Sequence, residues 1–135
     1  MTLHRSGTRY LKSIYLLHQR SERVRKCDIA KELGYSKASV SSMIGRLCAQ
    51  GYVYVLNHDV CLTRDGLRCA RELCGKCGAI RDFWVEVLRI DGATARREAE
   101  QLAHVISADT LHALERELRE RRPAKDDSPA GKMAD

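Results

Sequence analysis

Residues 26–63 read KCDIAKELGYSKASVSSMIGRLCAQGYVYVLNHDVCLT. The pattern of this stretch predicts two helices joined by a short turn. The first begins near Asp28 and ends at Gly34, a residue that tolerates the backbone angles of a helix end. The second begins after Ser36, whose hydroxyl can accept a hydrogen bond from a free amide of the first turn. The apolar spacing gives this second helix a buried face made of Val40, Ile44 and Leu47.

A two-stranded wing is predicted directly after these helices. Gly51 ends the second helix, residues 52–56 are predicted to form a strand, residues 57–59 a turn and residues 60–62 the returning strand. The whole stretch is therefore predicted to be a helix-turn-helix followed by a β-wing. A helix that buries one side and offers small polar groups on the other can lie in the major groove of DNA.

The rest of the chain is predicted to be mainly helical. Val24 is expected to begin a short strand that pairs with the wing, and Thr63 and Ser107 are expected to cap the helices that follow them. Gly75 and Gly78 lie inside the long helix after Thr63 and permit either a kink or the close approach of another helix. The helices expected outside the central stretch cover residues 8–21, 64–89, 93–105 and 108–121.

This order of elements predicts a mainly α-helical protein of two domains and a tail. Residues 1–73 are expected to form an N-terminal winged helix-turn-helix and residues 74–121 an all-helical dimerisation domain, whereas residues 122–135 are polar and expected to be disordered. The last helices offer more apolar surface than one copy can cover, so residues 80–118, with Trp84 among them, are the expected dimer interface. Two-fold pairing would place two recognition helices about 34 Å apart, one turn of DNA.

Charge is unevenly distributed along the chain, whose net charge is +6. Residues 1–76 carry 14 Lys and Arg against 6 Asp and Glu, a balance of +8. Residues 77–135 carry 10 against 12, a balance of −2. The basic half is the half that contains the helix-turn-helix, which is the distribution expected of a phosphate-binding surface.

Six cysteines lie at positions 27, 48, 61, 69, 74 and 77. The N-terminus lacks the apolar core of a secretory signal and no run approaches transmembrane length, so a cytoplasmic protein without a membrane partner is expected. Thiols stay reduced in that compartment, which favours core residues or metal ligands over disulfides. Cys27, Cys48 and Cys61 are expected in the core, and His18 is expected to be an isolated surface or half-buried group.

The order of segments resembles the diphtheria-toxin-repressor family of iron- and manganese-dependent regulators, in its short manganese-sensor form. The family's first helix is matched by TRYLKSIYLL (8–17), its helix-turn-helix by VRKCDIAKELGYSKASVSSMIGRLCAQGYV (24–53), and its return strand and linking helix by VCLTRDGLRCA (60–70). Its dimerisation helices are matched by FWVEVLRID (83–91) and by EAEQLAHVIS (98–107), which ends in a His-x-x-Ser turn. The resemblance implies the two-domain form, without the SH3-like domain of longer members.

The resemblance also implies a regulatory metal. In the family, metal binds between the first helix, the linking helix and the helix with the His-x-x-Ser turn, and binding turns on repression. Cys77, Glu100 and His104 fall at ligand positions and can bind a metal, with Cys74 one turn before Cys77 as a further donor. Sulfur donors beside an imidazole and a carboxylate favour zinc or iron over manganese. The other implied ligand positions hold Arg9, Lys12 and Ala103, which cannot bind a metal.

Arg9 and Lys12 support a second hypothesis for the same place. Glu100 can form an ion pair with either cation, which would then occupy part of the space that the metal fills in relatives. The active shape of such a regulator would need no metal, and the protein would be constitutive or thiol-responsive.

The candidate contacts with DNA lie on the second helix of the helix-turn-helix and around it. Three serines match the family's recognition-helix positions, and a serine hydroxyl can bond a phosphate or a base edge. The basic residues are expected to meet phosphates or bases, and the histidine at the wing tip is expected to meet the minor groove or a phosphate. The candidates are Lys37, Ser39, Ser41, Ser42, Arg46, Arg25 and His58.

Three hypotheses for function follow. The first is a dimeric transcriptional repressor that binds double-stranded DNA and is controlled by a transition metal. The second is a winged-helix regulator that needs no metal. The third, a winged-helix module that binds only protein, is disfavoured by the basic half of the chain. An enzyme is not expected, because the sequence offers no Gly-rich phosphate loop, no paired carboxylates on facing elements and no Ser/His/Asp set.

Overall fold

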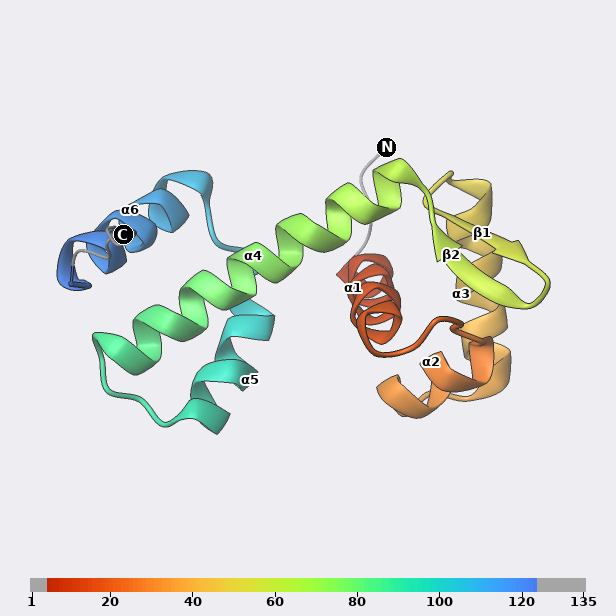
Figure 1. Ribbon diagram of the computed structural model, residues 1–135, viewed down its shortest axis with the longest axis horizontal. Coiled ribbons are helices and arrows are strands. Elements are labelled where there is room, and N and C mark those ends of the chain that lie inside the picture. Colours follow the sequence, from red (N-terminus) through yellow and green to blue (C-terminus); the bar gives the residue numbers. More distant parts are fainter. Residues whose placement is uncertain (1–4, 124–135) are drawn as a thin grey trace, which may run out of the picture. The chain divides into compact units, whose positions relative to one another are not determined.

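A computed structural model describes residues 5–123, and residues 124–135 of the expected tail lie outside them. The chain divides into two compact units, Met1–Gly75 and Lys76–Asp135. The long helix α4 (Arg64–Glu86) begins in the first unit and ends in the second (Figure 1). Six helices and one two-stranded sheet make up the described part, which confirms the mainly α-helical fold class.

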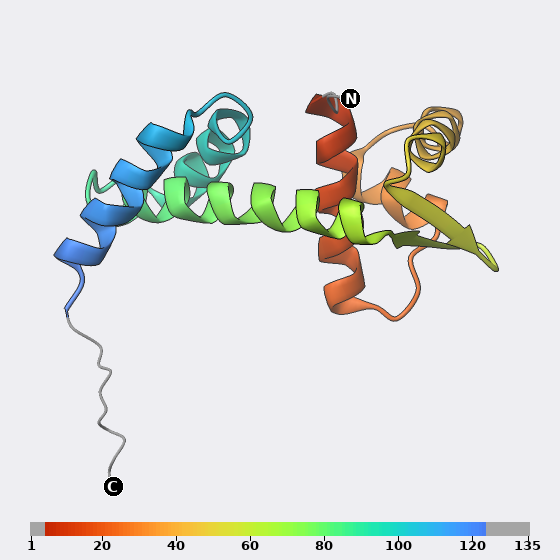
Figure 2. The ribbon, with the colours of Figure 1, turned by 90° about the horizontal axis from the view of Figure 1, so that it is seen from above.

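The first unit has the predicted winged helix-turn-helix. Its elements before α4 are α1 (Arg5–Arg20), α2 (Lys26–Leu33), α3 (Lys37–Ala49), β1 (Val53–Leu56) and β2 (Asp59–Leu62). Helix α1 begins three residues before the expected start. It contacts α2 and strand β2, while α3 contacts α2 and strand β1 (Figure 2).

Local signals set the turn between α2 and α3. Gly34 has a φ of 73°, in the left-handed region, and its N–H donates to the Ala30 carbonyl at 2.8 Å. The hydroxyl of Ser36 accepts a hydrogen bond from the Ser39 amide at 3.1 Å, which caps α3. Both predicted helix boundaries are confirmed, because each depends on one residue and its immediate neighbours.

The wing is a tight hairpin whose strands pair from Val53 with Leu62 to Leu56 with Asp59. Its turn is only Asn57-His58, and both residues have positive φ angles, 51° and 67°. Two consecutive positive φ angles are typical of a type I′ turn, which suits the twist of a hairpin. The expected turn over residues 57–59 was therefore one residue too long, since Asp59 belongs to β2.

The strand expected at Val24 is present only as a single backbone hydrogen bond between this residue and the wing. The amide of Val60 donates to the Val24 carbonyl at 2.7 Å. The amide of Val24 donates to Asp59 Oδ1, also at 2.7 Å, and not to a backbone oxygen. The Asp59 carboxylate thus takes the place of the backbone carbonyl that would accept this bond in a third strand. The sheet therefore has two strands.

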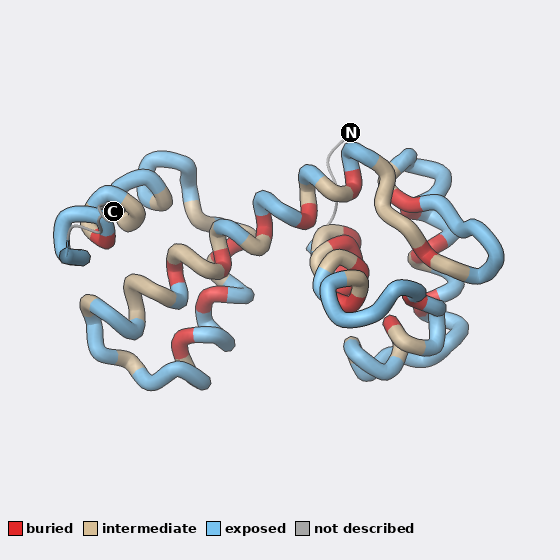
Figure 3. Tube along the Cα trace, in the orientation of Figure 1, coloured by how far each residue is buried: buried red, intermediate tan, exposed pale blue. Residues whose placement is uncertain are grey.

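The core of the first unit lies between α1, the helix-turn-helix and the wing, and Figure 3 shows the buried positions along α1. Large apolar side chains dominate it, as expected for a unit that can fold around a single cluster. The buried cluster consists of Tyr10, Leu11, Ile14, Leu17, Val24, Ile29, Val40, Ile44, Leu47, Val53, Val60 and Ala70.

Helix α4 starts where Thr63 caps it, as expected. The amide of Gly66 donates to Thr63 Oγ1 at 3.1 Å, and the Thr63 hydroxyl donates to the Gly51 carbonyl at 2.7 Å. The helix continues through Gly75 and Gly78. A Cβ at Gly75 would meet no atom of the described chain within 4 Å, so close packing inside the chain does not explain this glycine.

The second unit contains the end of α4 with helices α5 (Gly92–Leu102) and α6 (Ala108–Arg121). Asp91 caps α5 by accepting a hydrogen bond from the Thr94 amide, and Ser107 caps α6 as predicted. Up to residue 123, the buried side chains of this unit are few and mostly small, so the core seen here is thin. They are Cys77, Ile80, Ala95, Ala99, Ala103 and Leu118.

Candidate nucleic-acid interface and metal centre

Helix α3 presents a free face opposite its buried stripe. Val40, Ile44 and Leu47 are at most 1% exposed, so the helix turns these three side chains into the core. All seven side chains predicted to contact DNA are exposed, five of them on α3 itself. A helix anchored on one side and open on the other has the arrangement needed to enter a major groove. The five are Lys37, Ser39, Ser41, Ser42 and Arg46.

Ser39 is also part of the cap. The Ser36 hydroxyl donates to Ser39 Oγ at 3.0 Å while it accepts from the Ser39 amide. This double contact fixes the Ser39 side chain at the first turn of α3. Its own hydroxyl proton can still be donated to a phosphate or base acceptor.

Small residues line the middle of the exposed face of α3. Ala38, Ser42, Gly45 and Ala49 recur at three- or four-residue spacing and so follow one side of the helix. A Cβ at Gly45 would meet no atom of the described chain within 4 Å. Glycine inside a helix costs about 1 kcal/mol relative to alanine. Since packing within the chain does not require this glycine, the row of small residues suits the close approach of another molecule.

The wing is held in shape from the link before α2. Nη2 of Arg23 donates to the Asn57 carbonyl at 2.6 Å, which fastens the turn. His58 is exposed beside it, at the tip where the sequence placed it. Strand β1 leaves Tyr54, Val55 and Leu56 exposed, so these side chains of the wing are accessible to another molecule.

Two further basic side chains of the first unit lie on α1 and at the start of α2. Arg25 is exposed and stands at the start of α2, where its amide donates to Asp28 Oδ2 at 2.9 Å. Arg9 donates to the Tyr35 hydroxyl at 3.1 Å, and its guanidinium lies 5.9 Å from the centre of that ring. The rings of Tyr35 and Tyr10 also pack together, with their centres 5.9 Å apart. Burial raises the pKa of Tyr10. Arg9 is therefore positioned by an aromatic partner within the first unit.

Two cysteines expected in the core are exposed. Cys27 is two residues before the buried Ile29 and Cys48 directly follows the buried Leu47. Successive residues on a helix are 100° apart, so a cysteine one or two positions from the buried stripe turns away from it. That prediction was wrong for Cys27 and Cys48, while Cys61 is half-buried.

The predicted metal donors lie mainly in the second unit. Cys77 is buried in α4, Glu100 is exposed on α5, and His104 is half-buried just after α5. The amide of His104 donates to the Gln101 carbonyl at 3.3 Å, in the turn that follows α5. Cys74, half-buried, precedes Cys77 by one turn. A thiolate, a carboxylate and an imidazole are a suitable donor set for zinc or iron(II).

A second group of donors was missed by the sequence analysis. His18 is not isolated: its Nε2 lies 2.8 Å from the Val60 carbonyl and 3.8 Å from Asp59 Oδ1. The thiol of Cys61 donates to Asp59 Oδ2 at 3.3 Å. The Val24 amide holds the pKa of Asp59 below its usual value, and burial raises the pKa of Cys61. The i, i+2 spacing of Asp59 and Cys61 was a visible signal, but nothing local pointed to His18.

No helix among residues 5–123 combines the length and the apolar character that crossing a membrane demands.

Two family models match the chain. The N-terminal DNA-binding domain of the iron dependent repressors matches residues 2–58. The metal-binding and dimerisation domain of the same family matches residues 63–130. The division between these domains agrees with the order of a winged helix-turn-helix followed by a helical unit.

Individual relatives agree with the family models. A transcriptional regulator of the helix-turn-helix type from Methanocaldococcus jannaschii is 34% identical over 107 residues, 78% of this chain and 86% of that protein. The transcriptional regulator MntR of Salmonella typhimurium is 33% identical over 90 residues, 66% of this chain and 57% of that protein. The solved structure of the manganese regulator SloR has 29% identity and a TM-score of 0.75, and the match covers 88% of this chain and 55% of SloR.

This chain thus spans little more than half the length of MntR and SloR. The two domain models nevertheless cover most of its residues, and the fold has the same order of elements. The chain therefore belongs to the iron-dependent repressor family, the family of the diphtheria toxin repressor and MntR, whose members are metal-dependent transcriptional regulators and not enzymes.

Proposed function

We propose that the protein is a dimeric, cytoplasmic repressor that binds operator DNA through α3 and the wing, and that a divalent transition metal in the second unit controls this binding. The exposed face of α3 is the observation that carries the proposal. This face carries hydroxyl and basic groups beside a row of small residues. It lies within residues 1–76, whose charge balance is +8. Phosphates supply most of the affinity for such a surface, and base contacts supply its selectivity.

Pairing of two copies is supported by the second unit. Three of the six buried residues in its described part are alanines, so the core seen there is thin. Val85, Leu88 and Val105 are at the same time 38%, 50% and 69% exposed. A second copy that covers these side chains would complete the core and set two recognition helices about one DNA turn apart.

Metal control is supported by the donors of α4 and α5. Cys77, Glu100 and His104 would hold the ion, which would supply a fixed positive charge that ties these helices together. SloR is described as a manganese regulator, but the buried thiol of Cys77 favours a softer ion in this chain. We expect zinc or iron(II) to bind here more tightly than manganese.

The test is selection of operator DNA from a pool of random duplexes by the full chain, with chelator and with each metal in turn. Selected sites are expected to be two-fold symmetric, with half-sites about 10 base pairs apart. Affinity should fall steeply with salt, with a log–log slope of about −0.9 per phosphate neutralised. Binding without salt sensitivity or sequence preference would contradict the DNA-binding part.

The metal part is tested separately on the selected duplex. Chelator is expected to weaken binding by about 5- to 150-fold, the usual range of coupling between two sites. The double variant Cys77→Ala/His104→Ala should bind as weakly as the chelated protein. A matched control, Cys27→Ala/His112→Ala, removes an exposed cysteine and an exposed histidine and should respond to metal as wild type does. Undiminished binding by both chelated protein and the first variant would favour the metal-independent regulator.

A further inference from the structure

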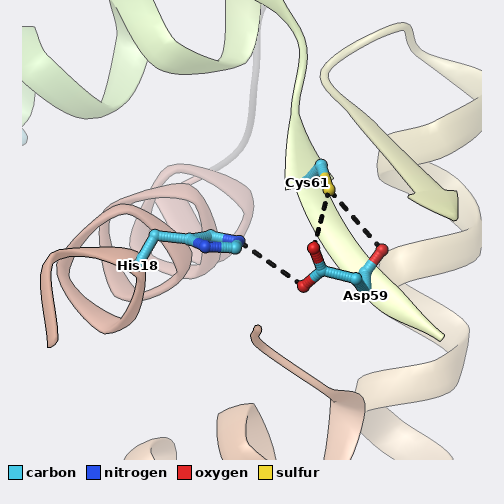
Figure 4. A group of neighbouring side chains, drawn as sticks. All are labelled: His18, Asp59 and Cys61. Atoms are coloured by element: carbon cyan, nitrogen blue, oxygen red, sulfur yellow. Dashed lines mark hydrogen bonds and ion pairs between the residues drawn. The ribbon is translucent and has the colours of Figure 1, made fainter. Parts of the chain in front are cut away.

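Three side chains of types that commonly bind metal ions lie close together where the wing contacts α1. His18 comes from α1, and Asp59 and Cys61 come from β2, two residues apart and so on one face of that strand. One donor atom from each residue forms a set within 4.8 Å of one another. Figure 4 shows the Asp59 carboxylate between the imidazole ring and the sulfur. The group belongs wholly to the first unit and shares no residue with the metal donors of the second.

The spacing of the group is close to that of a metal site. Zinc bonds of about 2.0–2.3 Å in a tetrahedron place neighbouring ligand atoms about 3.3–3.8 Å apart. His18 Nε2 lies 3.8 Å from Asp59 Oδ1, and Cys61 Sγ lies 3.3 Å from Asp59 Oδ2. Small side-chain rotations, without backbone movement, would bring the three donors onto one ion.

Backbone bonds around the group already position it. The buried Val24 donates its amide to Asp59 Oδ1 at 2.7 Å, which leaves Oδ2 on the side of the thiol. A ligating carboxylate in a metal site is usually held in this way by an outer hydrogen bond. The side chains of His18 and Asp59 are 25% and 20% exposed, so an ion can reach them without unfolding of the unit.

Metal binding would replace two existing hydrogen bonds. Nε2 of His18 faces the Val60 carbonyl, so it must give up this contact, with its proton carried on Nδ1 instead, to offer a lone pair. The thiol of Cys61 must release its proton to solvent and lose its bond to Asp59. Bonds from the imidazole nitrogen and the thiolate to the ion would take the place of these two hydrogen bonds.

We infer that His18, Asp59 and Cys61 form a second metal site, which takes a zinc-like divalent transition metal with water as its fourth ligand. Three protein ligands and one water are a common zinc arrangement. An ion held there would join β2 directly to α1 and so fix the wing to the body of the DNA-binding unit. The inference concerns the first unit alone, and it stands or falls independently of metal control through Cys77.

Cobalt(II) titration of the reduced, metal-free full chain tests the site, because a thiolate ligand gives cobalt a sulfur-to-metal charge-transfer band. The background variant carries Cys74→Ala, Cys77→Ala and His104→Ala, which removes the sulfur and imidazole donors of the metal site proposed around Cys77. This background is expected to keep a charge-transfer band at one cobalt per chain. Adding Cys61→Ser should abolish the band, and adding Cys27→Ser, at an exposed cysteine, should leave it intact.

Wild-type protein gives a second readout that needs no variant to fold. Alkylation of each cysteine is followed by mass spectrometry with and without zinc. At free zinc about 100 times its dissociation constant, alkylation of Cys61 should slow about 100-fold, while Cys27 in the same molecule reacts at an unchanged rate. Equal rates at Cys61 with and without zinc would overturn the inference, as would a cobalt band that survives Cys61→Ser. Loss of metal-controlled DNA binding in Cys77→Ala/His104→Ala with Cys61 still protected would separate the two sites.

Discussion

Arg122 holds Glu86 through both carboxylate oxygens: its Nε donates to Oε1 at 2.9 Å and its Nη2 to Oε2 at 2.8 Å. The same Nη2 donates to Asp82 Oδ2 at 3.1 Å. These bonds tie the residue that follows α6 to the end of α4, 36 positions earlier. They lower the pKa of Glu86, because the guanidinium stabilises its charged form.

Replacing Arg122 with alanine should destabilise the second unit in a pH-dependent way. A carboxyl whose pKa is lower in the folded state stabilises the fold above its unfolded pKa, and this stabilisation is lost as the pH falls through the folded pKa. We therefore expect Arg122→Ala to lower the melting temperature at pH 7 and to approach wild type below about pH 4. Thermal melts over a pH series measure this. Arg119→Ala, at an exposed position of α6, is the control, and a constant deficit at every pH would contradict the prediction.

Removing the hydroxyl of Ser13 should stabilise the first unit. Its Oγ is buried and has no hydrogen-bond partner among the residues described, and an unpaired buried polar atom costs about 1–3 kcal/mol. Ser13→Ala is expected to raise the free energy of unfolding by about 1 kcal/mol or more. Denaturant titration measures it against Ser41→Ala, an exposed helical serine whose change reports only the gain in helix propensity. Equal gains for both variants would show that the Ser13 hydroxyl is satisfied.

Alanine substitutions at two glycines should change the free energy of unfolding in opposite directions. A Cβ at Gly66 would collide with the Tyr52 carbonyl oxygen, a backbone atom that already accepts from the Thr63 amide. Gly66→Ala is therefore expected to cost about 3 kcal/mol through overpacking. Gly45→Ala adds a methyl in open space and should gain up to about 1 kcal/mol. Equilibrium unfolding of both variants, with m-values compared, checks the pair.

A charge on the exposed apolar surface of the second unit should separate the proposed dimer. Val105 is 69% exposed, and Val105→Asp would place a carboxylate within the expected interface. We expect the variant to sediment as a monomer at concentrations where wild type is a dimer. Leu56→Asp is the matched control, because Leu56 is 61% exposed on the wing and should leave the dimer intact. Dimers in both variants would place the interface elsewhere.

Arg46 should contribute to DNA binding mainly as a charge. It is exposed on α3, and loss of one phosphate contact reduces the log–log salt slope by about 1. Arg46→Ala should therefore bind operator and random DNA more weakly in similar proportion. Arg71→Ala, at an exposed position of α4, keeps the same net charge as this variant and should keep the wild-type slope. A loss confined to operator DNA would instead indicate a base contact by Arg46.

The parts of the fold that the sequence predicts well are those set by neighbouring residues. Ser36 and Ser107 cap their helices as expected, because a cap needs only a hydroxyl and an amide three residues later. Gly34 ends α2 for an equally local reason. The charge balance of the two halves also indicated the DNA-binding half without any knowledge of contacts.

The parts that the sequence does not predict depend on distant residues. His18 meets Asp59, 41 positions later, because α1 contacts β2, and no local pattern contains that contact. Cysteines are usually buried in proteins, and on that basis Cys27 and Cys48 were wrongly predicted to lie in the core. The roles of the DNA and metal candidates remain predictions, since they concern molecules outside the chain.

The bond from Arg23 to the Asn57 carbonyl orders the wing tip before any DNA arrives. A segment that is already ordered does not lose conformational entropy at the moment of binding, so less of the contact free energy is offset. Under the proposed function, a substitution of Arg23 would therefore change how long the protein stays on its DNA site through the order of the wing tip, without any change in a base contact.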